Sequence, residues 1–517
     1  MTGNRNVDLS RAGMPVNDYQ DWSEAGWRRH LPGVADVPAF VAGLGGETIP
    51  ALAAAAAAAV PDRVAAAVDG QAITHAELDA AAARVAGWLA GRIRPGDRVL
   101  LAAGSSVGFV RCYLGALRAG AVVVLANPGY TAAELGHLAA DSGAVLAFAD
   151  REPARRLPGQ LPAVDVADLP DADPADDVVA RPQDTALLAY TSGTTGKPKG
   201  APLTHREVAV SVRAAMAAWR WQADEVLVHA LPLYHQHGLG GLHTALIAGS
   251  TVHIRSKFSP EDLAATIAAS RATALFAVPT IYQSLVDSAA AADPALRELR
   301  LAVCGSAPLS PALAGRLAGV LGQVPLIRYG TTESGLDVSN PIDDPRGDTV
   351  GVPLPGVQAR IAAEPGADGE IGVRGPQVFA GYWRDPAATA AALTPDGWFR
   401  TGDIGAVDPQ TGQLRIRGRI KEMIITGGLN VYPREVEIVL EAHPSVAEAA
   451  VAGLPDEHWG EQVTAWVVLR DGHAFDEAVL IAHARIQLAG YKCPKQVFRL
   501  AALPRNQLGK IVRSALA

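Results

Sequence analysis

The chain contains 517 residues, and 45 lysines and arginines against 53 aspartates and glutamates give a net charge of −8. This length predicts two or more domains, because a single hydrophobic core stops growing at roughly 250–300 residues. No long run of either charge occurs, which argues against nucleic acid as a partner. The three cysteines, Cys112, Cys304 and Cys493, form no metal-ligand spacing and favour a reducing, cytoplasmic compartment.

The first 46 or so residues contain Trp22, Trp27 and several prolines. We interpret residues 1–48 as an N-terminal extension that lies ahead of the first regular helix. Its charged, tryptophan-containing start does not match a secretory signal. The alanine-rich run at 51–60 favours a helix, and its ten apolar residues are too few to cross a bilayer. No membrane span is therefore expected.

From residue 49 the pattern alternates helices with short apolar strands. A hairpin is predicted for 64–68 and 71–74, because Asp69-Gly70 between them is a strong turn signal. A helix is expected at 76–89, and a loop at 165–184. Strand–helix alternation of this length predicts an α/β fold of stacked, mostly parallel sheets. Its further strands are expected at 97–102, 121–125, 144–149, 225–231, 251–254, 274–278, 301–304 and 325–327.

After Gly347 glycine and proline residues become more frequent. Short β patterns at 358–361, 370–373 and 413–416 predict a small antiparallel or barrel-like subdomain. A polar joint at 417–421 then leads to a compact C-terminal segment. This segment is expected to form strands at 447–451 and 463–469 and helices at 433–442 and 477–487. The chain is thus divided into the extension 1–48, a large domain 49–420 and a small mobile α+β domain 421–517.

The stretch 190–200 has the composition of a phosphate-binding loop. It holds four small hydroxyl residues, three glycines and two lysines, and it follows the apolar run 186–189. Glycines let the backbone approach an anion closely, and hydroxyl, amide and ammonium groups donate to it. The loop is not a Walker A motif, since only two residues separate Gly193 from Gly196 and Pro198 follows Lys197. A flexible surface linker is the alternative interpretation.

The segment 328–333 follows the predicted strand 325–327, a position where α/β proteins bind ligands. Tyr329 offers a flat face for adenine and Thr332 a hydroxyl for phosphate. Glu333 offers a hard oxygen ligand for Mg²⁺. An ordinary strand-to-loop turn remains the alternative for this segment.

These two segments resemble motifs of the adenylate-forming superfamily, which contains acyl-CoA synthetases, amino-acid adenylation domains and luciferases. Four further motifs of that superfamily follow in its order, at 399–403, 418–422, 425–430 and 504–510. The resemblance covers roughly residues 49–517. It implies an AMP-forming ligase that uses ATP, Mg²⁺ and CoA.

The resemblance also assigns roles to single residues. It implies that Lys510 contacts the substrate carboxylate and the α-phosphate, and that Asp403 accepts both ribose hydroxyls. Lys421 becomes the hinge of the C-terminal domain, and Gly427 with Gly428 lines the pantetheine tunnel. The implied catalytic residues are Lys510, Glu333, Thr332 and the gate residue His235. The implied ATP contacts are Thr191, Ser192, Gly193, Thr194, Thr195, Gly196, Lys197, Tyr329, Gly330, Thr331, Asp403 and Arg419, with Glu333 and Thr195 as Mg²⁺ ligands.

Two steps follow from this resemblance. The substrate carboxylate attacks the α-phosphate and pyrophosphate leaves. The C-terminal domain then rotates, withdraws Lys510 and presents Gly427-Gly428, and the CoA thiol displaces AMP.

The acyl pocket is expected near 231–238. Arg328 stands where most monocarboxylate ligases of the superfamily carry a small residue. A guanidinium is costly to bury unless it is paired, and a second substrate carboxylate would be a bidentate partner. Arg328 with the segments 235–238, 305–309 and 339–341 resembles the malonyl-CoA synthetase group. The implied pocket residues are Gln236, His237, Gly305, Ser306 and Arg328.

Three positions depart from that group: Gln236 replaces Thr or Val, Thr331 replaces Met, and 334–336 replaces a Thr-x-Met pattern. The favoured substrate is a small dicarboxylate such as malonate or methylmalonate. The alternatives are another short, medium-chain or aromatic acid, delivery to a carrier protein or a non-thiol nucleophile, and a nucleotide-binding module without catalysis. A salt bridge within the protein is the alternative role of Arg328.

Overall fold

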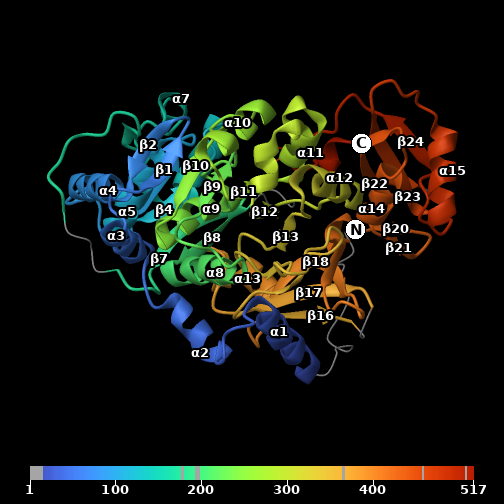
Figure 1. Cartoon of the computed structure of the whole chain (residues 1–517), viewed down its shortest axis with the longest axis horizontal. Helices are drawn as coiled ribbons and strands as arrows, with labels where there is room; N and C mark the ends of the chain where they lie inside the picture. Colours follow the sequence, from blue (N-terminus) through green and yellow to red (C-terminus); the bar gives the residue numbers. More distant parts are fainter. Residues whose placement is uncertain are drawn as a thin grey trace.

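The computed structural model describes residues 16–175, 180–191, 198–363, 367–456, 459–506 and 509–516. Figure 1 shows a large body and a smaller C-terminal part beside it, which contains β20–β24, α14 and α15. Within the described residues the large body contains a nine-stranded, a six-stranded and a four-stranded sheet. The predicted α/β architecture with a small second domain is therefore confirmed.

The six-stranded sheet has the order β6-β5-β3-β4-β7-β8. All of its strands run parallel except β8, which forms an antiparallel pair with β7 and was not predicted. The strands are β3 (Arg98–Ala102), β4 (Val122–Leu125), β5 (Ala144–Ala149), β6 (Ala163–Asp165), β7 (Thr185–Thr191) and β8 (Lys199–Thr204). The helices of this region are α4 (His75–Leu89), α5 (Val107–Arg118), α6 (Ala132–Ser142), α7 (Arg151–Ala154) and α8 (His205–Ala218).

The nine-stranded sheet has the order β15-β14-β13-β12-β11-β9-β10-β1-β2. β1 (Val64–Val68) and β2 (Gln71–Thr74) form the predicted hairpin, with both turn residues at positive φ. The other strands are β9 (Val226–His229), β10 (Thr251–Ile254), β11 (Ala274–Ala277), β12 (Leu301–Cys304), β13 (Leu326–Tyr329), β14 (Val338–Ser339) and β15 (Val352–Pro353). Associated helices are α9 (Gln236–Ala248), α10 (Pro260–Ser270), α11 (Pro279–Asp287), η2 (Ala289–Ala292), η3 (Pro294–Glu298) and α12 (Pro311–Leu321).

β13 extends past the predicted strand 325–327 and includes Arg328 and Tyr329. These two residues pair with Ser339 and Val338 of β14. Neither residue is apolar aliphatic, so the hydrophobic run in the sequence ended before the strand did. The pairing fixes the backbone of two predicted site residues.

The antiparallel subdomain after Gly347 is confirmed as a sheet of order β16-β17-β18-β19. Its strands are β16 (Gln358–Ala362), β17 (Gly369–Arg374), β18 (Phe399–Val407) and β19 (Leu414–Arg419), and α13 (Pro386–Ala392) precedes β18. The predicted joint 417–421 is partly strand, because β19 continues through Arg419 by pairing with Asp403. The turn η4 (Ile420–Glu422) follows it.

The expectation that residues 1–48 lie ahead of the first regular helix is wrong. They contain α1 (Val16–His30), α2 (Val37–Ala42) and η1 (Gly43–Gly45), and α3 (Ile49–Ala59) follows. α1 lies against β16 (Figure 1). The indole of Trp22 donates to the Gly412 carbonyl and that of Trp27 to the Val357 carbonyl, both at 2.8 Å.

The C-terminal part has its own sheet and its own core. The predicted strands and helices are present, and β20, β21 and β24 were not predicted. The elements are β20 (Ile424–Thr426), β21 (Leu429–Val431), α14 (Pro433–Glu441), β22 (Val446–Asp456), β23 (Gly460–Leu469), α15 (Glu477–Gln487), β24 (Gln496–Arg499) and η5 (Arg513–Ala515).

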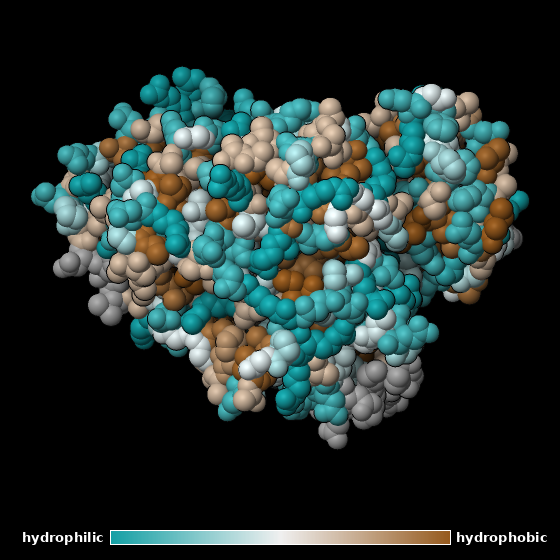
Figure 2. Space-filling view, in the orientation of Figure 1, coloured by the Kyte–Doolittle hydropathy of each residue, from teal (hydrophilic) through white to brown (hydrophobic). Residues whose placement is uncertain are grey.

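The surface in Figure 2 is mainly hydrophilic, with separate apolar patches, one of them over α15. Val479 and Ile486 of that helix are exposed. Across the described residues, no single helix has the length and apolar character needed to cross a membrane. The bent pair Val37–Gly45 and Ile49–Ala59 passes that test only jointly, with 98° between its halves.

Candidate active site

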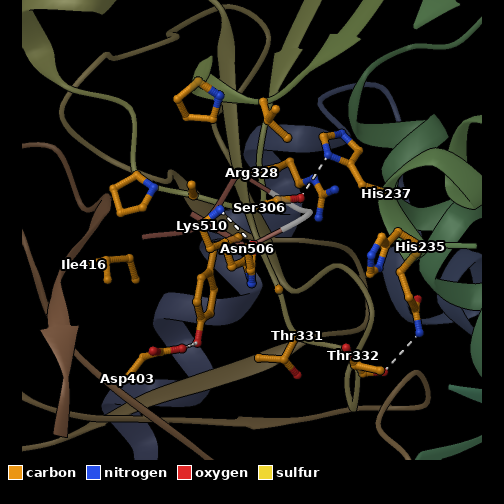
Figure 3. Close-up of a pocket in the computed structure, with 18 of the residues that line it drawn as sticks. His235, His237, Ser306, Arg328, Thr331, Thr332, Asp403, Ile416, Asn506 and Lys510 are labelled. Atoms are coloured by element: carbon orange, nitrogen blue, oxygen red, sulfur yellow. Dashed lines mark hydrogen bonds between the residues drawn. The ribbon is translucent and has the colours of Figure 1, made fainter. Parts of the chain in front are cut away.

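A cavity of about 2390 Å³ lies between the large body and the C-terminal part, and both contribute to its lining. Residues that follow β9, β11, β12 and β13 form one wall. These parallel strands end at the same edge of the sheet, which is where open α/β sheets bind ligands. Figure 3 shows side chains from this edge facing Lys510 and Asn506 of the C-terminal part.

Asp403 lines the cavity and is held by two neighbours. The Tyr329 hydroxyl donates to Asp403 Oδ2 at 2.7 Å, and Arg419 Nε lies 2.9 Å from Asp403 Oδ1. Burial, and then the nearby Asp403 carboxylate, raise the pKa of Tyr329 well above its ordinary value. The three predicted ATP contacts therefore form one hydrogen-bonded group.

Glu333 lines the cavity beside Thr332. The Tyr382 hydroxyl donates to Glu333 Oε1 at 2.8 Å, and the Lys199 ammonium lies 5.1 Å from the centre of the Tyr382 ring. Within the described ranges Glu333 Oε2 has no hydrogen-bond partner, so a hard carboxylate oxygen is available. That donor fits Mg²⁺, which is commonly held by one or two carboxylates together with substrate phosphates.

The phosphate-loop prediction is only partly covered by the structure. Thr191 ends β7 and lines the cavity together with Pro198 and Lys199. The predicted ATP contacts Ser192, Gly193, Thr194, Thr195, Gly196 and Lys197 lie outside the described residues.

A buried hydrogen-bond chain behind Thr331 was missed by the sequence reasoning. The hydroxyl oxygens of Thr331 and Ser334 are 2.9 Å apart, and Ser334 donates to Asp337 Oδ2 at 2.5 Å. Gln377 Nε2 donates to Asp337 Oδ1 at 3.1 Å. Burial raises the pKa of Asp337 to about 7, against the opposing effect of these hydrogen bonds. The only sequence signal was an acidic residue between Leu336 and Val338.

Lys510 is brought into the cavity from the C-terminal part. Its backbone N–H donates to Asn506 Oδ1 at 3.0 Å. Gly509, at φ 73°, lies so close to Thr280 that a Cβ would stand 3.1 Å from the Thr280 hydroxyl. Burial, and then Arg419, lower the pKa of Lys510. Burial, and then Lys510, lower the pKa of His235 to about 4. The predicted catalytic residues Lys510 and His235 therefore share the cavity.

Gly427 and Gly428 are not brought to the cavity. Both are exposed, and the Gly427 N–H donates to the Trp459 carbonyl at 2.8 Å. Lys421 does line the cavity, at the start of the C-terminal part. The structure thus presents Lys510 inward and the glycine pair outward.

Four of the predicted acyl-pocket residues line the cavity, namely Gln236, His237, Ser306 and Arg328, whereas Gly305 is buried and does not line it. Arg328 packs over Gly305, where a Cβ would come within 2.4 Å of the Arg328 Nε. His237 Nδ1 is 3.1 Å from Ser306 Oγ, and Gln236 Nε2 donates to the Thr332 carbonyl at 3.2 Å. Figure 3 shows His237, Ser306 and Arg328 grouped at one side of Lys510.

Arg328 makes no salt bridge with any carboxylate in the part of the chain that the structure describes. Burial lowers the pKa of its guanidinium to about 10, and the group is still charged at neutral pH. The side chain is half-buried, and a cation that is partly withdrawn from water without a counter-ion is unfavourable. The part of the cavity lined by Arg328 therefore favours the binding of an anion.

The AMP-binding enzyme family matches residues 53–383, and its C-terminal domain matches residues 435–510. Among curated proteins, a feruloyl-CoA synthase of an Amycolatopsis species is 38% identical over 86% of this chain and 93% of its own. The human mitochondrial malonate–CoA ligase ACSF3 is 35% identical over 84% of each chain. The ATP-bound structure of MatB from Rhodopseudomonas palustris superposes with a TM-score of 0.84, at 35% identity, over 91% of this chain and 98% of MatB.

Two stacked α/β sheets, an antiparallel subdomain and a small C-terminal domain around one cavity define an adenylate-forming enzyme. The chain belongs to the AMP-binding enzyme family. It is an acyl-CoA synthetase, an AMP-forming acid–thiol ligase.

Proposed function

We propose that the acid is a small dicarboxylate such as malonate or methylmalonate. The observation that carries this proposal is the Arg328 guanidinium, which faces the cavity without a carboxylate partner among the described residues. A distal substrate carboxylate would supply the missing counter-ion and accept two parallel hydrogen bonds from the guanidinium. A monocarboxylate of the same length would leave the half-buried cation without a counter-ion.

In the first step one oxygen of the reacting carboxylate attacks the α-phosphorus of ATP. The bond from that phosphorus to the bridging oxygen breaks, and pyrophosphate leaves with its electron pair. Charge builds on the α-phosphate, and the Lys510 ammonium is the group that faces it from the C-terminal domain. The loop that contains Thr191 would hold the phosphates, with Thr332 as a further donor. Asp403 and Arg419 would position the ribose, with Tyr329, Gly330 and Thr331 beside the base.

Mg²⁺ fits the open carboxylate oxygen of Glu333, and Thr195, which lies outside the described residues, would be its second ligand. When bound, it neutralises phosphate charge and polarises the phosphoryl group. Across the described residues no cluster of three or more His, Cys, Asp or Glu side chains forms a metal site. One carboxylate and the substrate phosphates are the usual Mg²⁺ ligands in such a site.

In the second step the CoA sulfur attacks the acyl carbonyl, and AMP leaves with the oxygen that came from the acid. The domains 49–420 and 421–517 would rotate about Lys421 between the steps. This rotation would withdraw Lys510 and bring Gly427-Gly428 to the pantetheine. His235, at the start of α9, would then act as the gate between the acyl pocket and the thiol. Free CoA in a cytoplasmic setting is the acceptor we favour over a carrier protein.

One observation favours a second acid. The feruloyl-CoA synthase relative is 38% identical over most of this chain, so an aromatic acid is the runner-up. In that case Arg328 would need a counter-ion other than the substrate.

An acid panel tests the proposal directly. Malonate, methylmalonate, butyrate, isovalerate and ferulate are each supplied with ATP and Mg²⁺, and AMP release is measured with and without CoA. We expect CoA-dependent AMP release to be fastest with malonate or methylmalonate. Fastest turnover of ferulate or a monocarboxylate would overturn the dicarboxylate assignment and leave the ligase class intact.

A further inference from the structure

Lys510 lies on the last segment of the chain, which follows β24. The described residues of this segment form no helix or strand other than the turn η5. Chain ends without regular structure are poorly ordered unless they are tied down. Leu503 and Leu516 pack with Trp466 of β23, which secures the segment to the sheet of the C-terminal part. The contacts that fix this segment decide where the Lys510 ammonium lies.

Arg513, three residues after Lys510, ties the segment to three other elements. Its Nε donates to the Val451 carbonyl of β22 at 3.0 Å, and its Nη2 lies 2.6 Å from Glu437 Oε1 of α14. Its Nη1 lies 3.0 Å from Glu422 Oε2. A guanidinium presents its N–H donors in a fixed planar arrangement. Three contacts from three directions therefore hold Arg513 in one place.

Glu422 connects this arginine to the proposed hinge. It is the last residue of η4 and directly follows Lys421. Along the chain 91 residues separate Glu422 from Arg513, but in the fold their side chains meet at the edge of the cavity that Lys510 lines. The hinge and the lysine are therefore joined by a route much shorter than the chain between them.

Glu437 anchors the other side of Arg513. Its side chain is 2% exposed, and its Oε1 also accepts from the Val451 N–H at 3.1 Å. Its Oε2 lies 3.4 Å from Arg434, which in turn pairs with Glu441 at 3.1 Å. A buried carboxylate with these partners is a fixed point, because leaving it unpaired is costly. Arg513 is thus anchored in the domain at one end and reaches the hinge at the other.

We propose that Arg513 is a positioning residue for Lys510. It ties the segment that carries the ammonium to Glu422, so that the hinge and Lys510 move as one unit. The inference rests on the roles proposed above for Lys510 in adenylation and for Lys421 in domain rotation. Without this tie, Lys510 would be in place in the cavity for a smaller fraction of the time, and the rate of adenylation follows that fraction.

The first test removes the arm that reaches the hinge. Glu422 is 33% exposed, so Glu422→Ala should disturb folding less than loss of the buried Glu437. Pyrophosphate release is measured with ATP and whichever acid of the panel is turned over fastest. We expect kcat of adenylation to fall on the order of 10-fold with KM for ATP nearly kept, because a charge-assisted hydrogen bond is lost. Glu422→Gln keeps an acceptor oxygen and should retain part of the rate.

The second test asks whether the tie acts through Lys510. Thioester formation from supplied acyl-adenylate and CoA should be nearly unchanged in Glu422→Ala. The double variant Glu422→Ala, Lys510→Ala should adenylate no more slowly than Lys510→Ala alone, since the lysine to be positioned is already absent. Arg513→Lys keeps the charge but cannot donate in three directions, so its adenylation should fall as that of Glu422→Ala does.

Arg499→Ala is the matched control. It removes an exposed arginine of β24 in the same domain and should leave adenylation unchanged. Unchanged adenylation in both Glu422→Ala and Arg513→Lys would overturn the inference and leave the role of Lys510 standing. Equal losses in both half-reactions, or a further loss on top of Lys510→Ala, would also overturn it, since the contacts would then serve only the fold. If Lys510→Ala itself keeps full adenylation, the proposed role of Lys510 fails, and the inference fails with it.

Discussion

At the scale of single residues, the structure answers whether Arg328 pairs with another residue of the protein. The sequence left open whether this arginine pairs with a protein carboxylate. In the described residues it does not, although Glu333 and Asp403 line the same cavity. Both of those carboxylates are engaged elsewhere, by Tyr382 and by Tyr329 with Arg419.

We expect Arg328→Leu to lose malonate selectively. The value of kcat/KM for malonate should fall on the order of 100- to 1000-fold, since the cation that pairs with the distal carboxylate in the cavity is removed. The value for isovalerate should fall far less or rise. Arg328→Lys is the matched control. It keeps the charge but lacks the planar guanidinium with its parallel N–H donors, so it should retain only part of the activity. Equal losses for both acids would contradict an anchoring role.

Lys510→Ala should separate the two half-reactions. Adenylation, followed by pyrophosphate release, should fall on the order of 100-fold or more, because the cation at the transferring phosphate is removed. Thioester formation from supplied acyl-adenylate and CoA should be nearly unaffected. Lys257→Ala, at an exposed lysine, is the control for loss of a positive charge. Equal damage to both half-reactions would argue that Lys510 serves a general structural role.

Asp337 makes the stability of the protein depend on pH. Its folded pKa of about 7 lies above the value of about 3.9 for an unfolded aspartate. The stabilisation that comes from protonated Asp337 is therefore fully present below about pH 4 and is lost as the pH rises through 7. An asparagine does not titrate, so Asp337→Asn does not have this loss. Between pH 4 and 8 the difference in free energy of unfolding between Asp337→Asn and wild type should therefore shift in favour of the variant by on the order of 3 kcal/mol.

Guanidinium unfolding of Asp337→Asn and wild type across this pH range measures the difference. The Asn side chain can donate to Ser334, which can then donate to Thr331, so the buried chain survives in reverse. Asp224→Asn, at an exposed aspartate, controls for the change in net charge. A difference between Asp337→Asn and wild type that does not vary with pH would refute the assignment.

At the scale of elements, the patterns that were local in sequence were predicted well. The hairpin 64–74 follows from its Asp-Gly turn, and the parallel strands follow from short apolar runs with their flanking helices. Elements whose partners are distant in sequence were not predicted. β8 and β14 each exist through pairing with a neighbour, and nothing in their own residues required it.

α1 shows why the N-terminal stretch was misjudged. Its residues are largely polar, and the face that it buries includes Ser23, Gly26 and His30 beside Tyr19, so few apolar residues mark it as a helix. Its attachment depends on indole N–H groups that reach backbone carbonyls far along the chain. Contacts in the site were missed for the same reason. The hydrogen bonds between Ser334 and Asp337 and between His237 and Ser306 join residues that only the fold brings together.

We expect α1 to stabilise the β16–β19 sheet. Trp27→Ala should lower the free energy of unfolding by about 2–3 kcal/mol, since a half-buried indole and its hydrogen bond are lost. Trp27→Phe, which keeps an aromatic ring, should lower it by about 1 kcal/mol. Chemical denaturation gives these values, and hydrogen exchange should be faster in β16. Arg28→Ala, at an exposed neighbour, should change stability by less than about 0.5 kcal/mol. An equal effect of Arg28→Ala would count against this docking.

At the scale of the whole molecule, the two parts of the chain complete one cavity. The large body supplies the strand ends with Arg328 and Tyr329, and the C-terminal part supplies Lys510. Gly427 and Gly428 lie outside that cavity, on the exposed side of the C-terminal part. One static arrangement therefore places the residues assigned to adenylation together and those assigned to thioester formation apart. Which arrangement the chain adopts could not be predicted from motifs, because both sets of motifs are present in one sequence.

A reversible crosslink can hold the molecule in this arrangement. A Cβ built on Gly509 would lie 3.9 Å from the Cβ of Thr280, within the spacing of about 3.5–4.5 Å that a disulfide requires. The double variant Thr280→Cys, Gly509→Cys should therefore join the C-terminal part to the start of α11 on oxidation. The three native cysteines are buried and free, so the new pair should be the one that oxidises first.

The oxidised double variant should still release pyrophosphate in a single turnover, because Lys510 remains in the cavity. It should not convert the acyl-adenylate to a thioester, because the domain that carries Gly427-Gly428 cannot rotate. Reduction by dithiothreitol should restore CoA-dependent AMP release. Each single cysteine variant is the matched control, since it carries the same substitution without the crosslink. If the oxidised form makes thioester at the rate of the reduced form, the two half-reactions share one arrangement and domain rotation is not part of the cycle.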